Sequence, residues 1–239
     1  MKLSALIFDV DGTLADTERD GHRPAFNAAF LEAGLTWHWD EALYGELLAV
    51  TGGKERMAFY AEKHDTEFLK RSDASARIAE LHKAKTRHFV RLMESGAIPL
   101  RPGIAELIGE ARAEGLTIAI ATTTTPENVS VLLRTNLAPD AEAWFAVIGA
   151  GDIVPAKKPA PDIYHWVLEH LGVPAAECLA VEDSGAGIKA SLGAGVPTVV
   201  TVNNYTRGQD FTGALAVLPD LSGTGLSALR TLHAGALGV

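Results

Sequence analysis

The sequence contains very little cysteine and no long apolar segment. Its one cysteine, Cys178, can neither form an internal disulfide nor supply a cluster of thiolate metal ligands. Because Cys178 begins an apolar run, we expect it to be a buried packing residue. No apolar run approaches the roughly 18 residues of a membrane helix, and the apolar stretch near the N-terminus is too short for a signal peptide. We therefore expect a cytoplasmic protein that does not associate with membranes.

Basic residues are also scarce. The 239 residues include 21 lysines and arginines against 30 aspartates and glutamates, which gives a formal net charge of −9. Proteins that bind nucleic acids usually carry a basic face, so this balance argues against a nucleic-acid partner. It still leaves room for a local basic pocket that binds a phosphorylated substrate.

Short apolar runs, each followed by polar residues, predict buried β-strands. They cover residues 3–8, 116–121, 146–150, 178–181 and 198–202. Apolar residues at helical spacing fill the intervals and also predict a helical tail, over residues 103–113, 127–137, 161–171, 186–194 and beyond 218. Strands that alternate with helices predict an α/β fold with a doubly wound, Rossmann-like parallel sheet. In such sheets ligands bind beyond the carboxyl ends of the strands.

One segment breaks this alternation. Residues 16–92 lack apolar strand runs, and their apolar residues recur at helical spacing. We predict that this segment is an α-helical cap domain inserted after the first strand. The α/β core domain then consists of residues 1–15 and 93–239.

The motif Asp9-Val-Asp11-Gly-Thr directly follows the first predicted strand. Two acids that are two residues apart can both face one cleft if the chain coils there. One carboxylate could attack phosphorus while binding a metal, and the other could transfer protons. Attack by a carboxylate gives an aspartyl-phosphate and divides hydrolysis into two easier steps. A loop with capping acids is the alternative, which the position after an N-terminal strand disfavours.

Further polar motifs follow other predicted strands. Thr122 offers a hydroxyl and an amide beside a helix N-terminus, where anions bind favourably. Lys158 supplies a positive charge for a phosphoryl group. Glu182 and Asp183 are ligands that suit Mg²⁺. Simple capping, a solvated lysine and acids at a helix N-terminus are the ordinary alternatives. Together, a metal and a lysine would neutralise phosphate so that an anionic nucleophile could approach it.

These motifs, in this order, resemble those of the haloacid dehalogenase superfamily of phosphohydrolases over nearly the whole chain. The resemblance implies that Asp9 is the nucleophile and Asp11 the general acid/base. It implies that Thr122 and Lys158 bind the phosphoryl oxygens.

The same resemblance implies a Mg²⁺ site. Its ligands would be the Asp9 carboxylate, the Asp11 main-chain carbonyl and Asp183. Glu182 would be a further ligand or a neighbour of the ligands.

The inserted segment resembles the cap of the CbbY proteins, which are related to β-phosphoglucomutase and phosphoglycolate phosphatase. The likeness in the cap lies in residues 17–23, 44–48, 51–57 and 81–86, and it continues in the core through residues 100–103 and 122–124. CbbY proteins hydrolyse xylulose 1,5-bisphosphate, an inhibitory by-product of Rubisco, the carbon-fixing enzyme of the Calvin cycle. The resemblance therefore implies this substrate.

A bisphosphate carries a second dianion that needs basic partners. The candidates in the cap are Lys54, Arg56, His82 and Lys85, although all but Lys54 could equally lie on solvated helix faces. Glu18 and His22 suit sugar hydroxyls, and the glycines at 52 and 53 would let backbone amides approach an anion. The full set of substrate-binding candidates is Glu18, His22, Thr51, Gly52, Gly53, Lys54, Arg56, His82, Lys85, Thr123, Thr124 and Asn128.

We predict a monomeric, Mg²⁺-dependent sugar-phosphate phosphatase that converts xylulose 1,5-bisphosphate to xylulose 5-phosphate. A sugar-phosphate mutase of the β-phosphoglucomutase type and a phosphoglycolate phosphatase are the alternative enzymes. A non-catalytic regulator that binds a metabolite is an alternative of another class, and the intact set of acids, hydroxyl and lysine speaks against it. A dinucleotide-binding role is weaker, because the first strand leads into acids rather than a glycine-rich turn.

Overall fold

The computed structural model describes residues 2–50 and 52–236 and divides the chain into two compact units. The core unit contains the chain up to Asp16 and from Pro99 onward, and the cap unit is Thr17–Ile98. Among the described residues, none of the helices combines the length and the hydropathy that crossing a bilayer demands.

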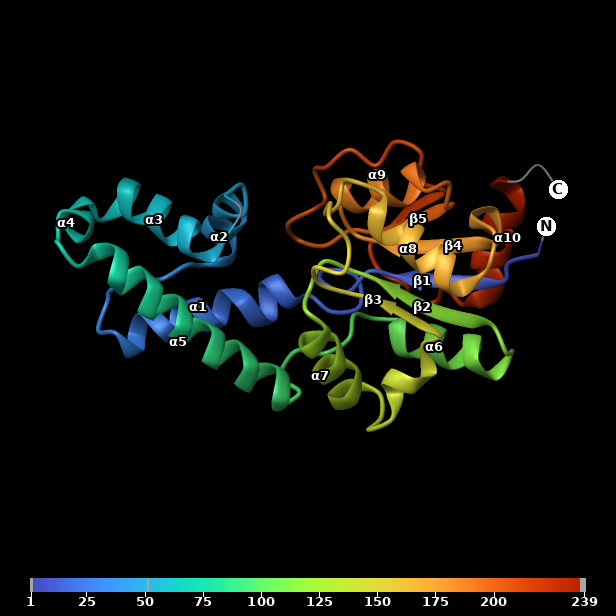
Figure 1. Ribbon diagram of the computed structural model, residues 1–239, viewed down its shortest axis with the longest axis horizontal. Coiled ribbons are helices and arrows are strands. Elements are labelled where there is room, and N and C mark those ends of the chain that lie inside the picture. Colours follow the sequence, from blue (N-terminus) through green and yellow to red (C-terminus); the bar gives the residue numbers. More distant parts are fainter. Residues whose placement is uncertain (1, 51, 237–239) are drawn as a thin grey trace. The chain divides into compact units, whose positions relative to one another are not determined.

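The core unit is built on a parallel sheet of six strands in the order β3-β2-β1-β4-β5-β6 (Figure 1). The strands are β1 (Ala5–Phe8), β2 (Thr117–Ala121), β3 (Val147–Gly149), β4 (Cys178–Glu182), β5 (Thr198–Thr201) and β6 (Ala216–Leu218). In the centre, Phe8 of β1 lies opposite Ile120 of β2 and Val181 of β4. The carboxyl ends of these three strands therefore meet at one edge of the sheet.

Helices follow the strands and cover both faces of the sheet. They are α6 (Ile104–Ala113), α7 (Pro126–Asn136), α8 (Asp162–Leu171), α9 (Gly185–Gly193) and α10 (Leu226–Ala236), with short 3₁₀ turns η2 (Ala141–Trp144) and η3 (Ala175–Glu177). Figure 1 shows α8 and α9 on one side of the sheet and α6 and α7 on the other. The predicted doubly wound α/β fold is confirmed. The predicted strands and helices of the core are all present, and β6 is an additional edge strand.

Alternation along the strands explains the packing of the core. Ala5 and Ile7 of β1 point to one face and are fully buried against Tyr164 and Val167 of α8. Leu6 and Phe8 point to the opposite face and are equally buried. A strand that is buried on both faces has a continuous apolar sequence, and this pattern predicted β1.

The cap unit is helical. It contains a π-helical turn η1 (Thr17–His22), then α1 (Arg23–Glu32), α2 (Glu41–Leu47), α3 (Gly53–His64), α4 (Thr66–Leu69) and the 21-residue α5 (Ala74–Glu94). An aromatic cluster forms its interior, with Trp39 at 4.7 Å from Phe26 and 4.8 Å from Phe30 between ring centroids. Gly21 in η1 is tightly enclosed, since a Cβ there would lie 2.5 Å from the Ile98 Cδ1 atom and 2.8 Å from the Phe89 ring.

The predicted boundaries of the cap need correction at both ends. The predicted end at residue 92 falls inside the last turn of α5, and the following turn folds back on that helix, with the Ala97 amide donating to the Leu92 carbonyl at 3.1 Å. Ile98 is fully buried and closes the unit. Asp16 belongs to the core unit, where it forms an ion pair with Arg101 at 3.3 Å. Sequence spacing alone could not reveal either contact.

Candidate active site

Four charged side chains converge at the carboxyl edge of the sheet. Asp9 follows β1, and its backbone amide donates to the carbonyl of Val181 in β4 at 3.0 Å. Glu182 ends β4 and Asp183 follows it, so the pairing of β1 with β4 brings these acids next to Asp9. Lys158 arrives from the segment that follows β3.

Lys158 links the parts of this site. Its Nζ atom donates to Asp9 Oδ1 at 2.6 Å, to Glu182 Oε1 at 2.6 Å and to the Ala121 carbonyl at 2.9 Å. Burial of the ammonium would lower the pKa of Lys158, but the carboxylates of Asp9 and Glu182 outweigh it and raise the pKa above its usual value. Lys158 is therefore a permanently charged group between two acids.

Glu182 is fully buried, and one of its oxygens is shared by two donors. Tyr164 on α8 donates its hydroxyl to Glu182 Oε1 at 2.5 Å, the same oxygen that accepts from Lys158. Burial raises the pKa of Glu182 to about 7, with Lys158 opposing the rise and Asp9 adding to it. The other oxygen lies against α9, where a Cβ on Gly187 would come within 1.8 Å of it. This geometry suits an acid that orients Lys158.

Asp183 is held from a different direction. Asn203, which lies just beyond the end of β5, donates its side-chain amide to Asp183 Oδ2 at 2.7 Å. Gly12 allows this approach, because its φ is +89° and a Cβ there would lie 2.2 Å from the same oxygen. Burial, followed by the charges of Asp9 and Glu182, raises the pKa of Asp183 well above its usual value.

The donor set fits a divalent cation. Asp9, Glu182 and Asp183 each offer a carboxylate oxygen, and these oxygens lie within 4.8 Å of one another in a buried position. One lysine does not balance three carboxylates, and a cation bound between them would relieve their mutual repulsion. Carboxylate oxygens are also the ligands that Mg²⁺ prefers. Since Glu182 Oε1 already accepts two hydrogen bonds and Oε2 lies against Gly187 of α9, Asp9 and Asp183 are the better-placed ligands.

The other predicted core residues lie at the same edge. Asp11 is part-exposed in the loop after β1, two residues beyond Asp9. Thr122 is buried directly after β2, and its backbone amide donates to the Gly149 carbonyl at 2.9 Å. Lys158 contacts Ala121, the residue before Thr122, which connects this strand end to Asp9.

Thr124 and Asn128 form a small group at the N-terminus of α7. The Asn128 side-chain amide lies 3.4 Å from the Thr124 hydroxyl, and the Asn128 backbone amide donates to Thr125, the N-cap residue. Thr123 lies beside them and is exposed. The free amides of this helix end can receive an anion.

In the cap unit, the predicted residues form two neighbouring groups. The first is joined by Tyr44, which sequence reasoning did not select. Its buried hydroxyl donates to Glu18 Oε2 at 2.5 Å and receives a hydrogen bond from Arg56 Nη1 at 2.9 Å. Arg56 is buried and also donates to the Leu47 carbonyl at 3.2 Å, so it is not a solvated surface residue.

The second group contains His22 and Lys85. Lys85 Nζ lies 2.7 Å from His22 Nδ1, and the His22 ring stacks on Phe89 with 4.0 Å between centroids. Burial, followed by the charges of Lys85, Arg56 and His82, lowers the pKa of His22 well below its usual value. His22 is therefore neutral and can accept a hydrogen bond from the Lys85 ammonium.

The remaining cap candidates lie at the start of α3. Gly53 lies against His82, whose ring a Cβ would approach to 2.8 Å, while Gly52 lies against the carboxylate of Glu55. Lys54 is exposed. Thr51 lies outside the described residues.

Tyr44, Tyr164 and Asn203 are the residues that sequence reasoning missed as parts of the site. Asn203 could have been predicted from the sequence in the same way as Asp9 and Asp183, because it directly follows a predicted strand. Tyr164 and Tyr44 lie within helices, where their spacing indicates only packing.

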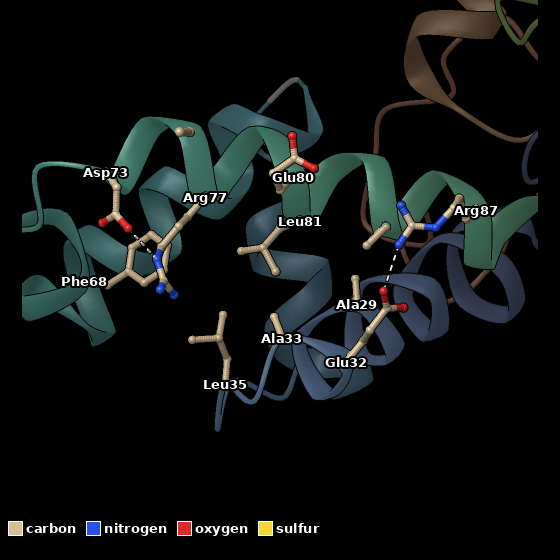
Figure 2. Close-up of a pocket in the computed structure, with 12 residues that line it drawn as sticks. Ala29, Glu32, Ala33, Leu35, Phe68, Asp73, Arg77, Glu80, Leu81 and Arg87 are labelled. Atoms are coloured by element: carbon tan, nitrogen blue, oxygen red, sulfur yellow. Dashed lines mark hydrogen bonds and ion pairs between the residues drawn. The ribbon is translucent and has the colours of Figure 1, made fainter.

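A separate cavity of about 370 Å³ lies in the cap unit between α1, α4 and α5 (Figure 2). Its floor includes Ala29, Phe68 and Leu81, and its rim carries the ion pairs of Arg87 with Glu32 and of Arg77 with Asp73. Within the described part of the chain, none of the predicted site residues lines this cavity.

Comparison with known proteins identifies the family. The model of the haloacid dehalogenase-like hydrolases matches residues 3–195. Plasmid-encoded protein CbbY of Cupriavidus necator is 52% identical over 92% of this chain and 86% of that protein. Mutant CbbY of Rhodobacter sphaeroides, crystallised with xylulose 1,5-bisphosphate, is 45% identical with a TM-score of 0.77, over 95% of this chain and 99% of that one.

A more distant structure is that of a putative β-phosphoglucomutase from Thermotoga maritima. It is 28% identical with a TM-score of 0.72, over 92% of this chain and 96% of that one. The family model spans well over half of the sequence and includes every motif at the carboxyl edge of the sheet. The chain is an enzyme that belongs to the haloacid dehalogenase-like hydrolase family.

Proposed function

We propose that the protein is a Mg²⁺-dependent phosphatase that converts xylulose 1,5-bisphosphate to xylulose 5-phosphate. The observation that carries the chemistry is the contact of Lys158 with Asp9 inside a cluster of three acids. The substrate is inferred from similarity to CbbY, since the R. sphaeroides relative was crystallised with xylulose 1,5-bisphosphate. Similarity over almost the full length of both chains supports a shared activity.

In the proposed reaction, a carboxylate oxygen of Asp9 attacks phosphorus and the bond to the sugar oxygen breaks. Asp11 gives its proton to that departing oxygen, which leaves an aspartyl-phosphate and xylulose 5-phosphate. Asp11 then takes a proton from water, which attacks phosphorus and releases inorganic phosphate from Asp9. Lys158 and Thr122 bind the phosphoryl oxygens throughout.

Mg²⁺ held by Asp9, Asp183 and the main-chain carbonyl of Asp11 would neutralise the negative charge of the phosphoryl group. Lys158 adds a fixed positive charge that needs no rearrangement during the reaction, because two acids already hold it in place. Without these charges, an anionic nucleophile and a dianionic phosphate would repel each other.

The cap supplies the proposed specificity. Arg56 and Lys85 would bind the phosphate group that stays on the sugar. Lys54 and His82 are close to them along the sequence of the cap. Glu18 and His22 would bind sugar hydroxyls. The burial of Arg56 and its contacts to Tyr44 and Leu47 support this proposal, because a solvated arginine would not be held by two fixed acceptors.

A phosphate-release screen tests the proposed function. The purified chain with Mg²⁺ is supplied with xylulose 1,5-bisphosphate, ribulose 1,5-bisphosphate, phosphoglycolate and β-glucose 1-phosphate. We expect preferred release from xylulose 1,5-bisphosphate and loss of turnover in Asp9→Asn, with an unchanged circular dichroism spectrum. Asp152→Asn is the matched control, since that acid is exposed and pairs with Lys157.

Two outcomes contradict the proposal. A preference for phosphoglycolate would overturn the substrate, and full activity of Asp9→Asn would overturn the nucleophile. Formation of glucose 6-phosphate from β-glucose 1-phosphate, with a bisphosphate primer and no free phosphate, would instead identify a mutase.

A further inference from the structure

Arg101 is a buried arginine in the core unit, immediately beyond the cap, and the proposed mechanism does not use it. The residue is 7% exposed, and its guanidinium donates to backbone carbonyls of several segments. Nη1 donates to Gly12 at 2.6 Å and to Thr201 at 2.9 Å, and Nη2 donates to Val202 at 2.6 Å and to Pro219 at 2.9 Å. One side chain thus connects the loop after β1 with the ends of β5 and β6.

The contacts to the loop after β1 form a regular series. Arg101 donates its side chain to the Gly12 carbonyl and its backbone amide to the Leu14 carbonyl at 2.8 Å, and its Nε atom lies 3.3 Å from Asp16 Oδ1. These contacts reach alternate residues of the loop that carries Asp11. The same residue therefore holds the loop at three points between Gly12 and Asp16.

We infer that Arg101 is a positioning residue, which fixes the Asp11 loop against the metal-binding acids for the proposed phosphoryl transfer. The link passes through Gly12, whose carbonyl accepts from Arg101 and whose α-carbon lies against the Asp183 carboxylate. Little free space separates them, since a Cβ on Gly12 would lie 2.2 Å from Asp183 Oδ2 and 2.8 Å from the Asn203 amide nitrogen. A shift of the Gly12 peptide would therefore move both Asp11 and Asp183 relative to Asp9.

A role confined to stability is the competing explanation, because the arginine satisfies carbonyls that would otherwise be buried without donors. The two roles differ in what they change. Loss of stability alone lowers the folded fraction and leaves each folded molecule fully active. Misplacement of catalytic groups lowers kcat per folded molecule and weakens the metal site, while binding of substrate by the cap is unaffected.

The test uses Arg101→Lys, because Arg101→Ala leaves several buried carbonyls without donors and risks unfolding. Lysine keeps the charge beside Asp16, but a single ammonium cannot reach carbonyls in three segments. Asp16→Asn is a milder second variant. Arg134→Lys is the matched control, since Arg134 is exposed and donates to the Ser130 carbonyl of its own helix.

We expect Arg101→Lys to lower kcat per folded molecule by about tenfold to a hundredfold, with KM for the bisphosphate changed by less than about twofold. Asp16→Asn should shift kcat in the same direction, and Arg134→Lys should match the wild type. Mn²⁺ affinity, measured by electron paramagnetic resonance without substrate, should fall in Arg101→Lys. The folded fraction is taken from urea unfolding of each variant.

This inference rests on the proposed phosphatase function, and the two fail in different ways. A wild-type chain that hydrolyses no sugar phosphate overturns the function, while weaker Mn²⁺ binding by Arg101→Lys than by Arg134→Lys still supports the positioning role. Wild-type kcat and Mn²⁺ affinity per folded molecule in Arg101→Lys would overturn the role of Arg101. An increase in KM with unchanged kcat would overturn it as well.

Discussion

At the scale of single residues, the hydroxyl of Tyr44 joins two of the proposed substrate-binding residues of the cap. It lies between the carboxylate of Glu18 and the guanidinium of Arg56, so it fixes the direction of both side chains. Truncation to phenylalanine preserves the ring and its packing against Trp39. The change therefore removes the hydrogen bonds of the hydroxyl to Glu18 and Arg56 and keeps the ring.

We expect Tyr44→Phe to raise KM for xylulose 1,5-bisphosphate by about fivefold to thirtyfold, which corresponds to about 1–2 kcal/mol for the lost hydrogen bonds. Hydrolysis of a small monophosphate that the cap does not recognise should be unchanged. Steady-state kinetics on both substrates provide the measurement, with Tyr60→Phe in the same aromatic cluster as control. Equal losses on the two substrates would contradict a role in recognition.

At the scale of elements, the start of α9 fits against the end of β4. Gly187 lies in the first turn of α9, and a Cβ there would lie 1.8 Å from the buried oxygen of Glu182. Ser184 caps the helix by accepting from the Gly187 amide at 3.1 Å, so the turn cannot move without loss of the cap. The close packing of α9 against the end of β4 thus requires that residue 187 has no Cβ atom.

We expect Gly187→Ala to destabilise the fold by about 1–3 kcal/mol, the usual range for overpacking a buried site. Gly109→Ala is a matched control, because Gly109 also lies within a helix and a Cβ there meets no atom within 4 Å. That change should stabilise the protein by about 0.5–1 kcal/mol through helix propensity. Urea unfolding of both variants measures the difference, and equal stabilities would contradict the packing argument.

The elements of the core were predictable because their signals are local. A run such as residues 178–181, buried on both faces, reads directly as a strand, and Thr125 with Pro126 marks a helix start. β6 was missed because it has three residues at the edge of the sheet and its Val217 is half-exposed. A strand of this kind is defined by pairing with β5, which no local pattern encodes.

At the scale of the whole molecule, a bound cation should contribute to stability. Folding brings three carboxylates together with a single lysine, so a cation has this site in the folded state and not in the unfolded chain. We expect Mg²⁺ at a hundred times its dissociation constant to stabilise the chain by about 2.7 kcal/mol by mass action. Asp183→Asn should remove most of this gain, whereas Asp210→Asn, an exposed acid, should not. Urea unfolding with and without Mg²⁺ checks this, and an equal gain in Asp183→Asn would exclude Asp183 as a ligand.

Part of the candidate site could be predicted from the sequence, because several of its residues lie at the ends of predicted strands. Asp9, Lys158 and Asp183 each follow a strand and Glu182 ends one, so the fold itself brings them together once the sheet is predicted. The partners that orient them do not follow this rule, because Tyr164 reaches Glu182 from the middle of a helix. The cap depends even more on tertiary contacts, and its limits became clear only from the fold-back of residues 95–98 and from the Asp16–Arg101 pair.

The position of β1 has a consequence for synthesis in the cell. This strand leaves the ribosome before both of its neighbours, which begin at Thr117 and Cys178 on the far side of the cap segment. At translation rates of about 5–20 residues per second, its second neighbour emerges roughly 10 to 35 seconds later. Until the first neighbour, β2, emerges, this fully apolar strand has no sheet partner in the nascent chain, which makes it a natural target for chaperones that shield hydrophobic segments.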